Sequence, residues 1–437
     1  MSQPIQPPYM PPIPATQPPV APAAPPSGSP VAPQAAPAPA PLGPSPVAQA
    51  PAPTGSAPAP RIPAPVVAPR PAQPPAPTAS ATPTPSAQPP AQASFGSDTQ
   101  HKVSADTAKL LSDAIAQVQR VIVGQEHMVE QLMVALLARG HCLLEGVPGV
   151  AKTLAVRSFA TVVGGSFARI QFTPDLVPSD IVGTRIYSAR KEEFDTALGP
   201  VFVNFVLADE INRAPAKVQS AMLELMAEGQ VSIGGVTHKL PSPFIVIATE
   251  NPIESEGVYP LPEAQRDRFL LKVEVPYPRG NEEFEILRRM SVTPPQANPV
   301  LTPDVVLGLQ NQASGVFVHN LVADYIVRLV LATRTPEEFG MPDLTSVIQV
   351  GCSPRATLGL VAAARALAMI HGRDYVLPTD VQAVAKDVMA HRLVLGFDAL
   401  ADEIQPSQVI ERIVAMVPPP TPVWNQQNRP AARQPGA

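Results

Sequence analysis

The most informative segment of the chain reads Glu145-Gly146-Val147-Pro148-Gly149-Val150-Ala151-Lys152-Thr153-Leu154. It follows an apolar run at residues 141–144 and leads into a helical pattern over residues 153–163. A glycine-rich turn of this kind points backbone N–H groups and the positive end of a helix dipole toward phosphate oxygens. Lys152 can neutralise those oxygens, and Thr153 can ligate Mg²⁺. We therefore predict a phosphate-binding loop formed by Gly146, Val147, Pro148, Gly149, Val150, Ala151, Lys152, Thr153 and Leu154.

One residue of this loop departs from the general pattern. Ala151 stands where G-x-x-x-x-G-K-[ST] has its second glycine, and its side chain restricts the backbone next to Lys152. Taken alone, the loop could also be a plain turn between a strand and a helix.

A pair of adjacent acids makes that alternative weaker. Asp209 and Glu210 follow an apolar run at residues 203–208, which places them at the rim of a sheet beside the phosphate loop. There Asp209 can hold the hydration shell of Mg²⁺, and Glu210 can activate water. A solvated strand end would account for two acids, but not for their position after a phosphate loop. The sequence thus predicts both binding and hydrolysis of a nucleotide.

Further polar residues are weaker candidates. Asn251 follows the run at residues 244–248 and could reach the terminal phosphate or the attacking water, although asparagine before proline is also a common turn residue. Arg266 and Arg268 precede the last apolar run, where arginines are usually paired at the surface. In a ring, one of them could instead reach a neighbour's nucleotide. Arg355, behind Ser353-Pro354, could contact phosphate across a domain cleft or simply lie exposed at a helix start.

The order of the patterns predicts an α/β domain over residues 104–278. Short apolar runs separated by helix-length segments, such as residues 215–228, are typical of right-handed crossovers over a parallel sheet. The runs lie at residues 141–144, 167–170, 203–208, 244–248 and 270–273. Repeated helix-start signals, as at Thr302-Pro303-Asp304, then predict a small helical domain over residues 279–417.

Two hairpins interrupt the alternation. Residues 230–233 and 236–240 flank Gly234-Gly235, whose freedom at positive φ suits a two-residue turn. A second hairpin would pair Ile186-Tyr187 with Phe194-Asp195. Either could be an ordinary surface decoration.

The ends of the chain differ in composition from its middle. More than half of the 60 prolines lie before residue 91, in a tract that offers little area to bury, so we predict a disordered tail over residues 1–103 and another over residues 418–437. Arg61 and Arg70 are the charges before residue 91, and removing +2 from the total of −5 leaves −7. An acidic body argues against unspecific binding of nucleic acid.

We find no pattern in the sequence that is typical of a secretory signal, a membrane span or a metal site. The start, Met1-Ser2-Gln3-Pro4, lacks the basic residues and apolar run of a secretory signal. No uninterrupted apolar segment approaches the roughly 20 residues that span a bilayer. The expectation is a soluble cytoplasmic protein. Cys142 and Cys352 are too few for a disulfide framework or a zinc site, so no metal is expected beyond the Mg²⁺ that accompanies a nucleotide.

In this order, the segments resemble the AAA+ ATPases and specifically the MoxR family, from about residue 106 to about residue 417. The similarity is carried by Val123-Gly124-Gln125, residues 145–153, Gln171-Phe172-Thr173-Pro174-Asp175-Leu176, Pro178-Ser179-Asp180-Ile181, and residues 207–214, 248–262 and 351–356. The resemblance implies a Walker A loop in which alanine at Ala151 is normal. It further implies the following assignments: Asp209 and Glu210 as Walker B, Asn251 as sensor 1, Arg268 as the arginine finger, Arg355 as sensor 2, and Val123 and Gly124 near adenine.

The family also gives the hairpins a role and makes one assignment ambiguous. They resemble the helix-2 insert and the pre-sensor-1 hairpin, which line a ring pore or face substrate. Arg266 replaces a usual apolar residue before the Asp-Arg-Phe triplet, so it competes with Arg268 as the finger; the intact triplet favours Arg268. Arg185 stands where an acid is common, and the proline-rich tail lies outside the family pattern.

The function implied by this resemblance is that of a chaperone-like remodelling ATPase. It would use ATP and Mg²⁺, assemble as a homo-oligomeric, hexameric ring and act on a protein client, often with a von Willebrand factor A domain protein. The proline-rich tail would then be a recruitment arm or only a spacer. Two alternatives stay open: a nucleic-acid-dependent AAA+ motor, which the acidic body disfavours, and a nucleotide-gated scaffold that does not hydrolyse.

Overall fold

The computed structural model describes residues 103–420, apart from residues 191, 254–256 and 292. Almost all of the two predicted tails, residues 1–102 and 421–437, lies outside this range. Within the described residues, no helix is long and apolar enough to cross a membrane.

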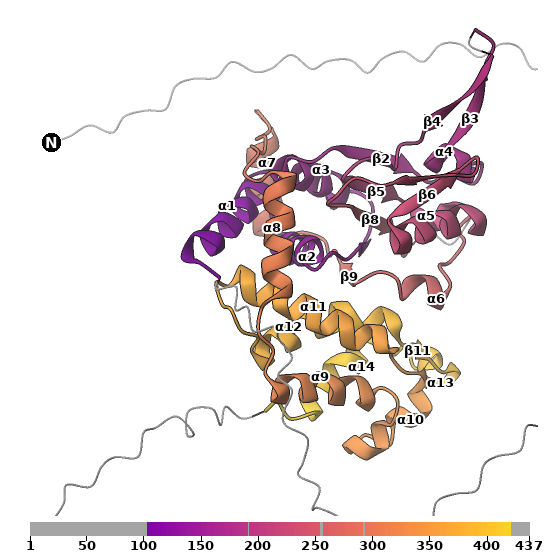
Figure 1. The fold of residues 1–437 in the computed structure, drawn as a ribbon. Helices are drawn as coiled ribbons and strands as arrows, with labels where there is room; N and C mark the ends of the chain where they lie inside the picture. Colours follow the sequence, from indigo (N-terminus) through magenta and orange to yellow (C-terminus); the bar gives the residue numbers. More distant parts are fainter. Residues whose placement is uncertain (1–102, 191, 254–256, 292, 421–437) are drawn as a thin grey trace, which may run out of the picture. The chain divides into compact units, whose positions relative to one another are not determined.

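A five-stranded parallel sheet forms the centre of the α/β domain (Figure 1). Its strands are the five predicted apolar runs, and their order is β2-β5-β8-β1-β9. The bounds are β1 Cys142–Glu145, β2 Phe167–Gln171, β5 Phe205–Asp209, β8 Ile245–Glu250 and β9 Leu271–Glu274. The phosphate loop follows β1 and the two acids lie at the end of β5. Because β8 lies between β1 and β5, one strand separates the loop from the acids.

Helices cover both faces of this sheet. Successive residues of a strand point to opposite faces, and the two faces belong to two separate buried clusters. Leu144 and Leu207 pack in the cluster that contains α1, α2 and α3, whereas Leu143 and Val206 pack in the cluster that contains α5. These helices are α1 Ala105–Val121, α2 Glu126–Leu137, α3 Lys152–Val163 and α5 Ala216–Glu228.

Both predicted hairpins are present. β3 (Gly183–Ser188) and β4 (Glu193–Leu198) pair in the predicted register, with Tyr187 opposite Phe194, and they project from the end of the sheet that carries β2 (Figure 1). β6 (Gln230–Ile233) pairs with β7 (Val236–Lys239) around Gly234 and Gly235. Both glycines have positive φ, +56° and +84°, as a two-residue primed turn requires. The short α4 (Pro178–Val182) precedes the first hairpin, and the 3₁₀ turn η1 (Ile211–Arg213) follows β5.

Helices dominate the chain after β9, as expected from the helix-start signals. The Oγ1 of Thr302 accepts a bond from the Val305 N–H at 3.4 Å, and the Oγ of Ser353 accepts one from the Arg355 N–H at 3.2 Å, so both caps form as predicted. The elements are α6 Glu263–Arg266 before β9, then α7 Gly280–Met290, α8 Pro303–Ser314, α9 Asn320–Ala332, η2 Pro336–Phe339, α10 Leu344–Val347, α11 Pro354–Ile370, α12 Pro378–Met389, η3 Ala390–Arg392, α13 Phe397–Ala401 and α14 Pro406–Met416.

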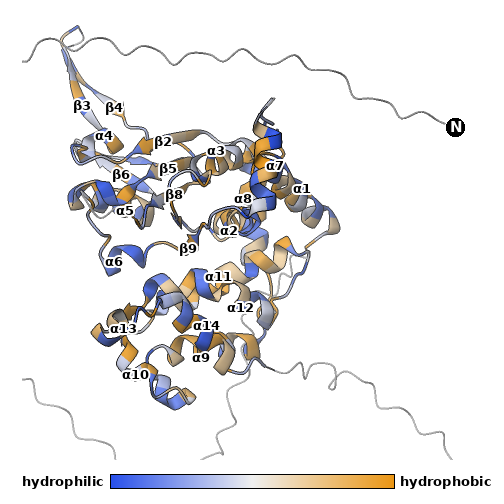
Figure 2. Cartoon of the chain, turned by 180° about the vertical axis from the view of Figure 1, so that it is seen from behind, coloured by the Kyte–Doolittle hydropathy of each residue, from blue (hydrophilic) through white to orange (hydrophobic). Residues whose placement is uncertain are grey.

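A small sheet in this helical part was not anticipated from the sequence. β10 (Ile348–Val350) and β11 (Val394–Leu395) pair antiparallel between helices. In Figure 2 the helices show both hydrophilic and hydrophobic colouring, as expected for elements that bury one side. One buried cluster runs from α1 and α2 into α11 and α12, so the two domains share a core.

Candidate functional site

The predicted phosphate loop connects the end of β1 to the start of α3. Gly146 has no room for a side chain. A Cβ atom at this position would lie 2.6 Å from the Val275 carbonyl oxygen, so a larger residue would displace β9 from β1. Ala151 takes a left-handed conformation, with φ at 62°. This conformation costs an alanine roughly 1 kcal/mol, which accounts for the glycine of the general pattern at this position.

Lys152 lies across the ends of two strands. Its Nζ donates to the carbonyl oxygens of Gly146 and Glu250, the latter at 3.1 Å. Burial lowers the pKa of Lys152, and the charges of Asp209 and Glu210 act in the opposite direction. The ammonium is therefore held at the mouth of the loop, with both predicted acids close enough to affect it.

Asp209, buried at the end of β5, meets the first turn of α3. Its Oδ2 accepts a bond from the Thr153 hydroxyl at 3.3 Å, and its Oδ1 accepts one from the Thr249 hydroxyl at 2.6 Å. Thr153 and Asp209, predicted to hold Mg²⁺, are therefore in contact. A hydroxyl and a carboxylate beside a phosphate loop form the oxygen donor set that Mg²⁺ prefers, so these residues fit the metal. No cluster of three or more His, Cys, Asp or Glu suited to another metal occurs among the described residues.

Glu210 has a left-handed backbone conformation, and three polar contacts hold the residue in place. Its φ is 56°, and its N–H donates to the Thr249 hydroxyl at 2.8 Å. Its carboxylate accepts a bond from Gln171 Nε2 at 2.7 Å and pairs with Arg213 at 2.9 Å. The side chain is held rather than free to reach water from this position.

Asn251 is buried and lines a pocket with the same two acids. Its Oδ1 accepts a bond from the Ile253 N–H at 3.2 Å, which is the turn role that asparagine often has. It nevertheless lines the same pocket as the phosphate loop. That pocket, of about 360 Å³, is lined by Pro148, Gly149, Ala151, Lys152, Thr153, Leu154, Arg169, Asp209, Glu210, Thr249 and Asn251.

The sequence did not lead us to predict three residues that line or support this pocket. Thr249 bonds both acids, while Arg169 and Gln171 of β2 bond Asp209 and Glu210. The available signal was the alternation of two polar residues around Ile170 in an otherwise apolar strand. In an edge strand, however, such alternation usually indicates a solvent face.

Val123 and Gly124, predicted to lie near adenine, precede α2 and stand outside the residues that line this pocket. A Cβ atom on Gly124 would lie 2.5 Å from Glu282 Oε2, so the turn packs closely against the start of α7. Gln125 fixes it further through a bond from Nε2 to the Pro276 carbonyl at 3.0 Å. Their contact with a base remains a prediction.

The three predicted arginines separate into two groups. Arg268 donates to the Leu223 carbonyl at 2.6 Å and shares a pocket of about 400 Å³ with Arg355. Arg266 instead lines another pocket with Leu393, and its Nη2 lies 3.9 Å from Glu263. Arg268 and Arg355 are thus brought together, but neither lines the pocket of the phosphate loop. The contact of Arg355 with a phosphate across a domain cleft stays a prediction.

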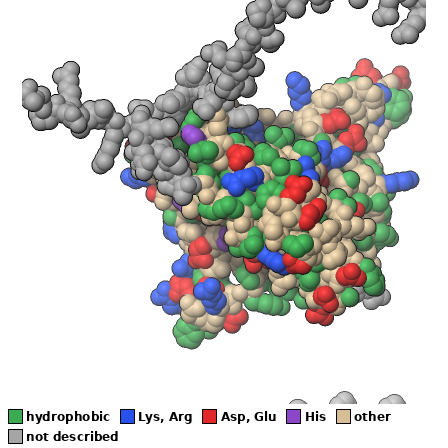
Figure 3. All heavy atoms as spheres, turned by 90° about the horizontal axis from the view of Figure 1, so that it is seen from below, with side chains coloured by type: hydrophobic (Ala, Val, Ile, Leu, Met, Phe, Trp, Pro, Cys, Tyr) green, Lys and Arg blue, Asp and Glu red, His purple; other side chains and the backbone are tan. Residues whose placement is uncertain are grey.

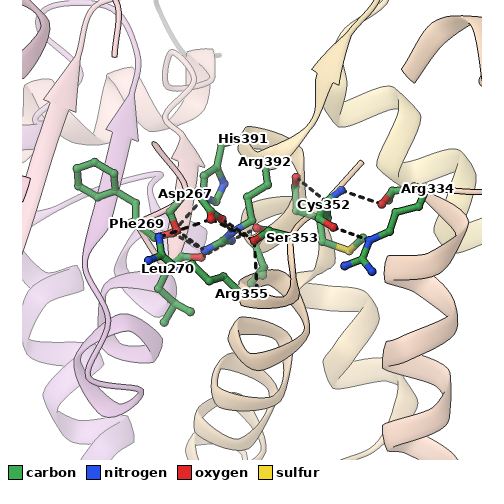
Figure 4. Close-up of polar contacts among 12 residues, drawn as sticks. Asp267, Phe269, Leu270, Arg334, Cys352, Ser353, Arg355, His391 and Arg392 are labelled. Atoms are coloured by element: carbon green, nitrogen blue, oxygen red, sulfur yellow. Dashed lines mark hydrogen bonds and ion pairs between the residues drawn. The ribbon is translucent and has the colours of Figure 1, made fainter. Parts of the chain in front are cut away.

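Asp267, between the two competing arginines, joins the α/β domain to the helical domain (Figure 4). Its carboxylate accepts bonds from Ser353 Oγ at 3.1 Å and Arg392 Nε at 2.9 Å, and it lies 3.6 Å from Arg355. Arg392, almost fully buried, also donates to the carbonyl oxygens of Phe269 at 2.6 Å and Leu270 at 3.2 Å. The segment that carries Arg268 is therefore fastened to the helical domain.

Replacing Arg392 with methionine should destabilise the protein strongly. The change removes the buried partner of Asp267 and one donor from each of the Phe269 and Leu270 carbonyl oxygens, which should cost on the order of 3 kcal/mol. Urea denaturation followed by circular dichroism measures the loss. Arg288→Met is the matched control, because Arg288 pairs with Glu285 at the surface and should contribute less than about 1 kcal/mol. Equal denaturation midpoints for the two variants would contradict this account of the joint.

Known families match both domains of the chain. The model of the ATPase family associated with various cellular activities (AAA) matches residues 141–271, and that of the AAA lid domain matches residues 345–413. The first match runs from β1 to β9 and so contains the phosphate loop, both acids and Asn251. The second covers the end of the helical domain, from α10 to α14.

Individual relatives agree with these matches. The chain is 64% identical over 307 residues to Chaperone MoxR1 of Mycobacterium tuberculosis, an alignment that covers 70% of this chain and 81% of that protein. It is 32% identical over 330 residues to Protein MoxR of Paracoccus denitrificans, covering 70% and 96%. The crystal structure of a candidate ATPase from Cytophaga hutchinsonii superposes with a TM-score of 0.69 at 45% identity, covering 73% of this chain and 97% of that one.

These similarities extend over the parallel sheet, the phosphate loop and the helical domain together, and they confirm the predicted fold class and the predicted ATPase activity. The chain belongs to the MoxR family of AAA+ ATPases.

Proposed function

We propose that this ATPase hydrolyses ATP with Mg²⁺ in the pocket between the phosphate loop and the end of β5, and that it uses the energy to remodel protein clients. The observation that carries the first part is the contact of Thr153 with Asp209 at 3.3 Å, with Lys152 in the same pocket. A hydroxyl, a carboxylate and an ammonium there match what a magnesium-bound triphosphate needs.

Each side chain then has a distinct task. Lys152 and the N–H groups of the loop bind the phosphates, while Thr153 and Asp209 hold Mg²⁺, which when bound neutralises charge on the phosphate oxygens. Glu210 accepts the proton of the attacking water, and the buried Asn251 orients that water or the terminal phosphate. Because Glu210 is bonded to Gln171 here, its carboxylate must exchange that bond before it accepts the proton.

The exposed hairpins support a protein client. Four large apolar side chains of the β3–β4 hairpin are more than half exposed: Ile186, Tyr187, Phe194 and Leu198. Arg185 stacks over Phe194 at 5.0 Å, which keeps the aromatic ring at the surface. Exposed apolar groups that lie together on one hairpin are typical of interaction surfaces, and contacts with other proteins are one such use. A relative that is 64% identical carries the name of a chaperone, which agrees with this proposal.

The position of the arginines supports a homo-oligomeric ring. Arg268 and Arg355 line a pocket away from the chain's own phosphate loop, so the nucleotide that they could contact is a neighbour's. We further propose, from the family resemblance, that the ring is a hexamer and that a von Willebrand factor A domain protein is its partner. The alternative of a nucleic-acid motor is disfavoured, because acidic and basic side chains are interspersed over the face in Figure 3.

Glu210→Gln should separate binding from hydrolysis. The amide cannot accept a proton, so phosphate release should fall about 10²- to 10⁴-fold while affinity for ATP stays near that of the wild type. Glu224→Gln, on the exposed face of α5, is the control and should hydrolyse normally. Turnover by Glu210→Gln at the wild-type rate would remove Glu210 from its role.

The same variant tests the client. Rings trapped with ATP should retain a bound protein in a pull-down, and a parallel experiment without residues 1–97 shows whether the proline-rich segment recruits it. If ATPase activity is instead stimulated by DNA, and binding to DNA is tight and sensitive to salt, the motor alternative replaces the chaperone.

A further inference from the structure

A histidine of the α/β domain reaches a buried acid of the helical domain. His127, in the first turn of α2, donates from Nε2 to Oδ2 of Asp387, in the last turn of α12, at 2.8 Å. The His127 side chain is 52% exposed, whereas that of Asp387 is only 2% exposed. A buried carboxylate is costly unless it is paired. His127 therefore supplies, from the other domain, the partner that Asp387 needs.

The two residues lie at unfavourable ends of their own helices. A cation is disfavoured at the N-terminus of a helix and an anion at the C-terminus, because each meets the like end of the helix dipole. Protonated His127 at the start of α2 and ionised Asp387 at the end of α12 are both placed in this way. The stability of each helix alone does not account for these residues, whereas an ion pair between the two helices does.

Other titratable groups face this pair from the elements around it. They are Glu130 of α2, Lys386 of α12, Glu274 of β9, which lies 3.5 Å from Lys386, Cys142 of β1, and His371 at the end of α11, which lies 3.5 Å from Glu130. Burial and the charge of Asp387 raise the pKa of the Cys142 thiol, so it stays neutral.

The nearby His371 is held differently from His127. The buried acid closest to it, Asp380, already accepts a bond from Arg373 Nη2 at 2.6 Å and lies 4.0 Å from the His371 ring. Asp380 therefore has a permanent cation as its partner and does not depend on a histidine. Asp387 does depend on one.

The contact with Asp387 lies next to a turn that adjoins the phosphate loop. Residues 123–125, predicted to lie near adenine, lead directly into the start of α2. Gln125 is bonded to the Pro276 carbonyl at 3.0 Å, and Gly146 of the phosphate loop packs against the preceding residue, Val275. α2 also lies beside α11 and α12 of the helical domain (Figure 1). A shift of α12 against His127 would therefore move the start of α2 and this turn with it.

We propose that His127 and Asp387 form a fastener between the two domains that closes when His127 is protonated and holds the turn before α2 in its nucleotide-binding position. The effect on nucleotide rests on the function proposed above, whereas the effect on stability does not. Neutral His127 leaves the buried carboxylate with a weaker partner, so the domains are held less firmly and nucleotide binds less tightly. Both residues are positioning residues, and neither takes part in hydrolysis.

The direction of the pH effect follows from the surroundings of the ring. The hydrogen bond to Asp387 raises the pKa of His127 above its ordinary value of 6.5, and the charges of Asp387 and Glu130 add to this, whereas burial and Lys386 act in the opposite direction. When folding raises the pKa of a histidine, the added stability is fully present below pH 6.5 and is lost as the pH rises through the raised pKa. The fastener therefore weakens as the solution becomes alkaline.

The first test compares the melting temperatures of the wild type and His127→Gln without nucleotide. Glutamine keeps a donor for Asp387 but carries no charge, so the two proteins should melt alike at high pH, where His127 is neutral. At about pH 6 the wild type should melt about 2 to 4 °C above the variant, a shift typical of one stabilising interaction. Asp387→Asn should lose the same pH-dependent difference. His371→Gln is the matched control and should keep it, because Asp380 is paired with Arg373.

The second test measures the affinity for magnesium ATP with a fluorescent analogue. The titration of ATP itself is common to all proteins, so each variant is compared with the wild type at the same pH. His127→Gln should bind about fivefold more weakly than the wild type at about pH 6, a modest coupling between two sites, and equally well at about pH 9.

The outcomes separate this proposal from the function on which its second part rests. If His127→Gln and the wild type differ in melting temperature by the same amount at every pH, the protonated pair does not fasten the domains. If their melting temperatures differ as expected but their ATP affinities stay equal at low pH, the fastener does not act on the nucleotide-binding turn. Wild-type protein that binds no magnesium ATP at any pH would instead overturn the proposed function, and the result of the melting experiment would still stand.

Discussion

Replacing Lys152 with alanine is expected to weaken the binding of magnesium ATP by about 10²- to 10³-fold. The ammonium lies at the mouth of the phosphate loop, and a unit charge about 4 Å from a phosphate at the edge of a protein contributes roughly 4 kcal/mol before desolvation is subtracted. Since burial already lowers the pKa of Lys152, part of its desolvation is present before nucleotide arrives. Isothermal titration calorimetry measures the loss directly.

Folding should survive this substitution. Lys152 donates to the carbonyl oxygens of Gly146 and Glu250, and the adjoining pocket lets water replace those bonds. The melting temperature without nucleotide should therefore stay within a few degrees of the wild type. Lys217→Ala, an exposed lysine on α5, controls for the loss of one positive charge and should bind ATP normally. ATP affinity within threefold of the wild type for Lys152→Ala would contradict the assignment of the loop.

The pocket could be predicted because its central residues follow from local pattern and one rule of topology. Lys152 and Thr153 stand in a recognisable loop, and Asp209 ends a buried strand. Parallel strands end at the same edge, so the acids had to lie near the loop. Ala151 illustrates the limit of this reasoning. The sequence showed only that alanine replaces the glycine of the pattern. The structure shows that the backbone of Ala151 is left-handed, which is why alanine is less favourable than glycine at this position.

Residues whose roles depend on neighbours far along the chain could not be predicted in this way. Thr249 is a common strand residue, and nothing in its local sequence reveals bonds to both acids. Arg355 was recognised as a helix-start arginine, but its pocket depends on how the helical domain packs against α2 and α5. β10 and β11 have three and two residues, too few to show an alternating pattern.

Replacing Arg268 with alanine is expected to leave ATP binding intact and to lower kcat by about 10³- to 10⁵-fold, the effect of losing an arginine finger. Arg268 is exposed and shares its pocket with Arg355, so its guanidinium can face a neighbouring subunit. Arg266 is less exposed and lines a pocket with Leu393 and Leu395 of its own helical domain. Arg266→Ala should therefore retain most of the activity. Phosphate release and ATP affinity, measured on both variants, decide between the two arginines.

Mixing subunits then tests whether the finger acts between neighbours. An Arg268→Ala subunit keeps its own Glu210, whereas a Glu210→Gln subunit keeps its own Arg268, and both are inactive alone. Where the pocket of the first faces the arginine of the second, one complete site is restored, so the mixture should regain part of the turnover. A mixture that stays inactive although both variants assemble would place Arg268 outside the neighbour's site. If Arg266→Ala is inactive and Arg268→Ala is active, the finger is Arg266. The bonds of Asp267 to the helical domain then position Arg266 and not Arg268.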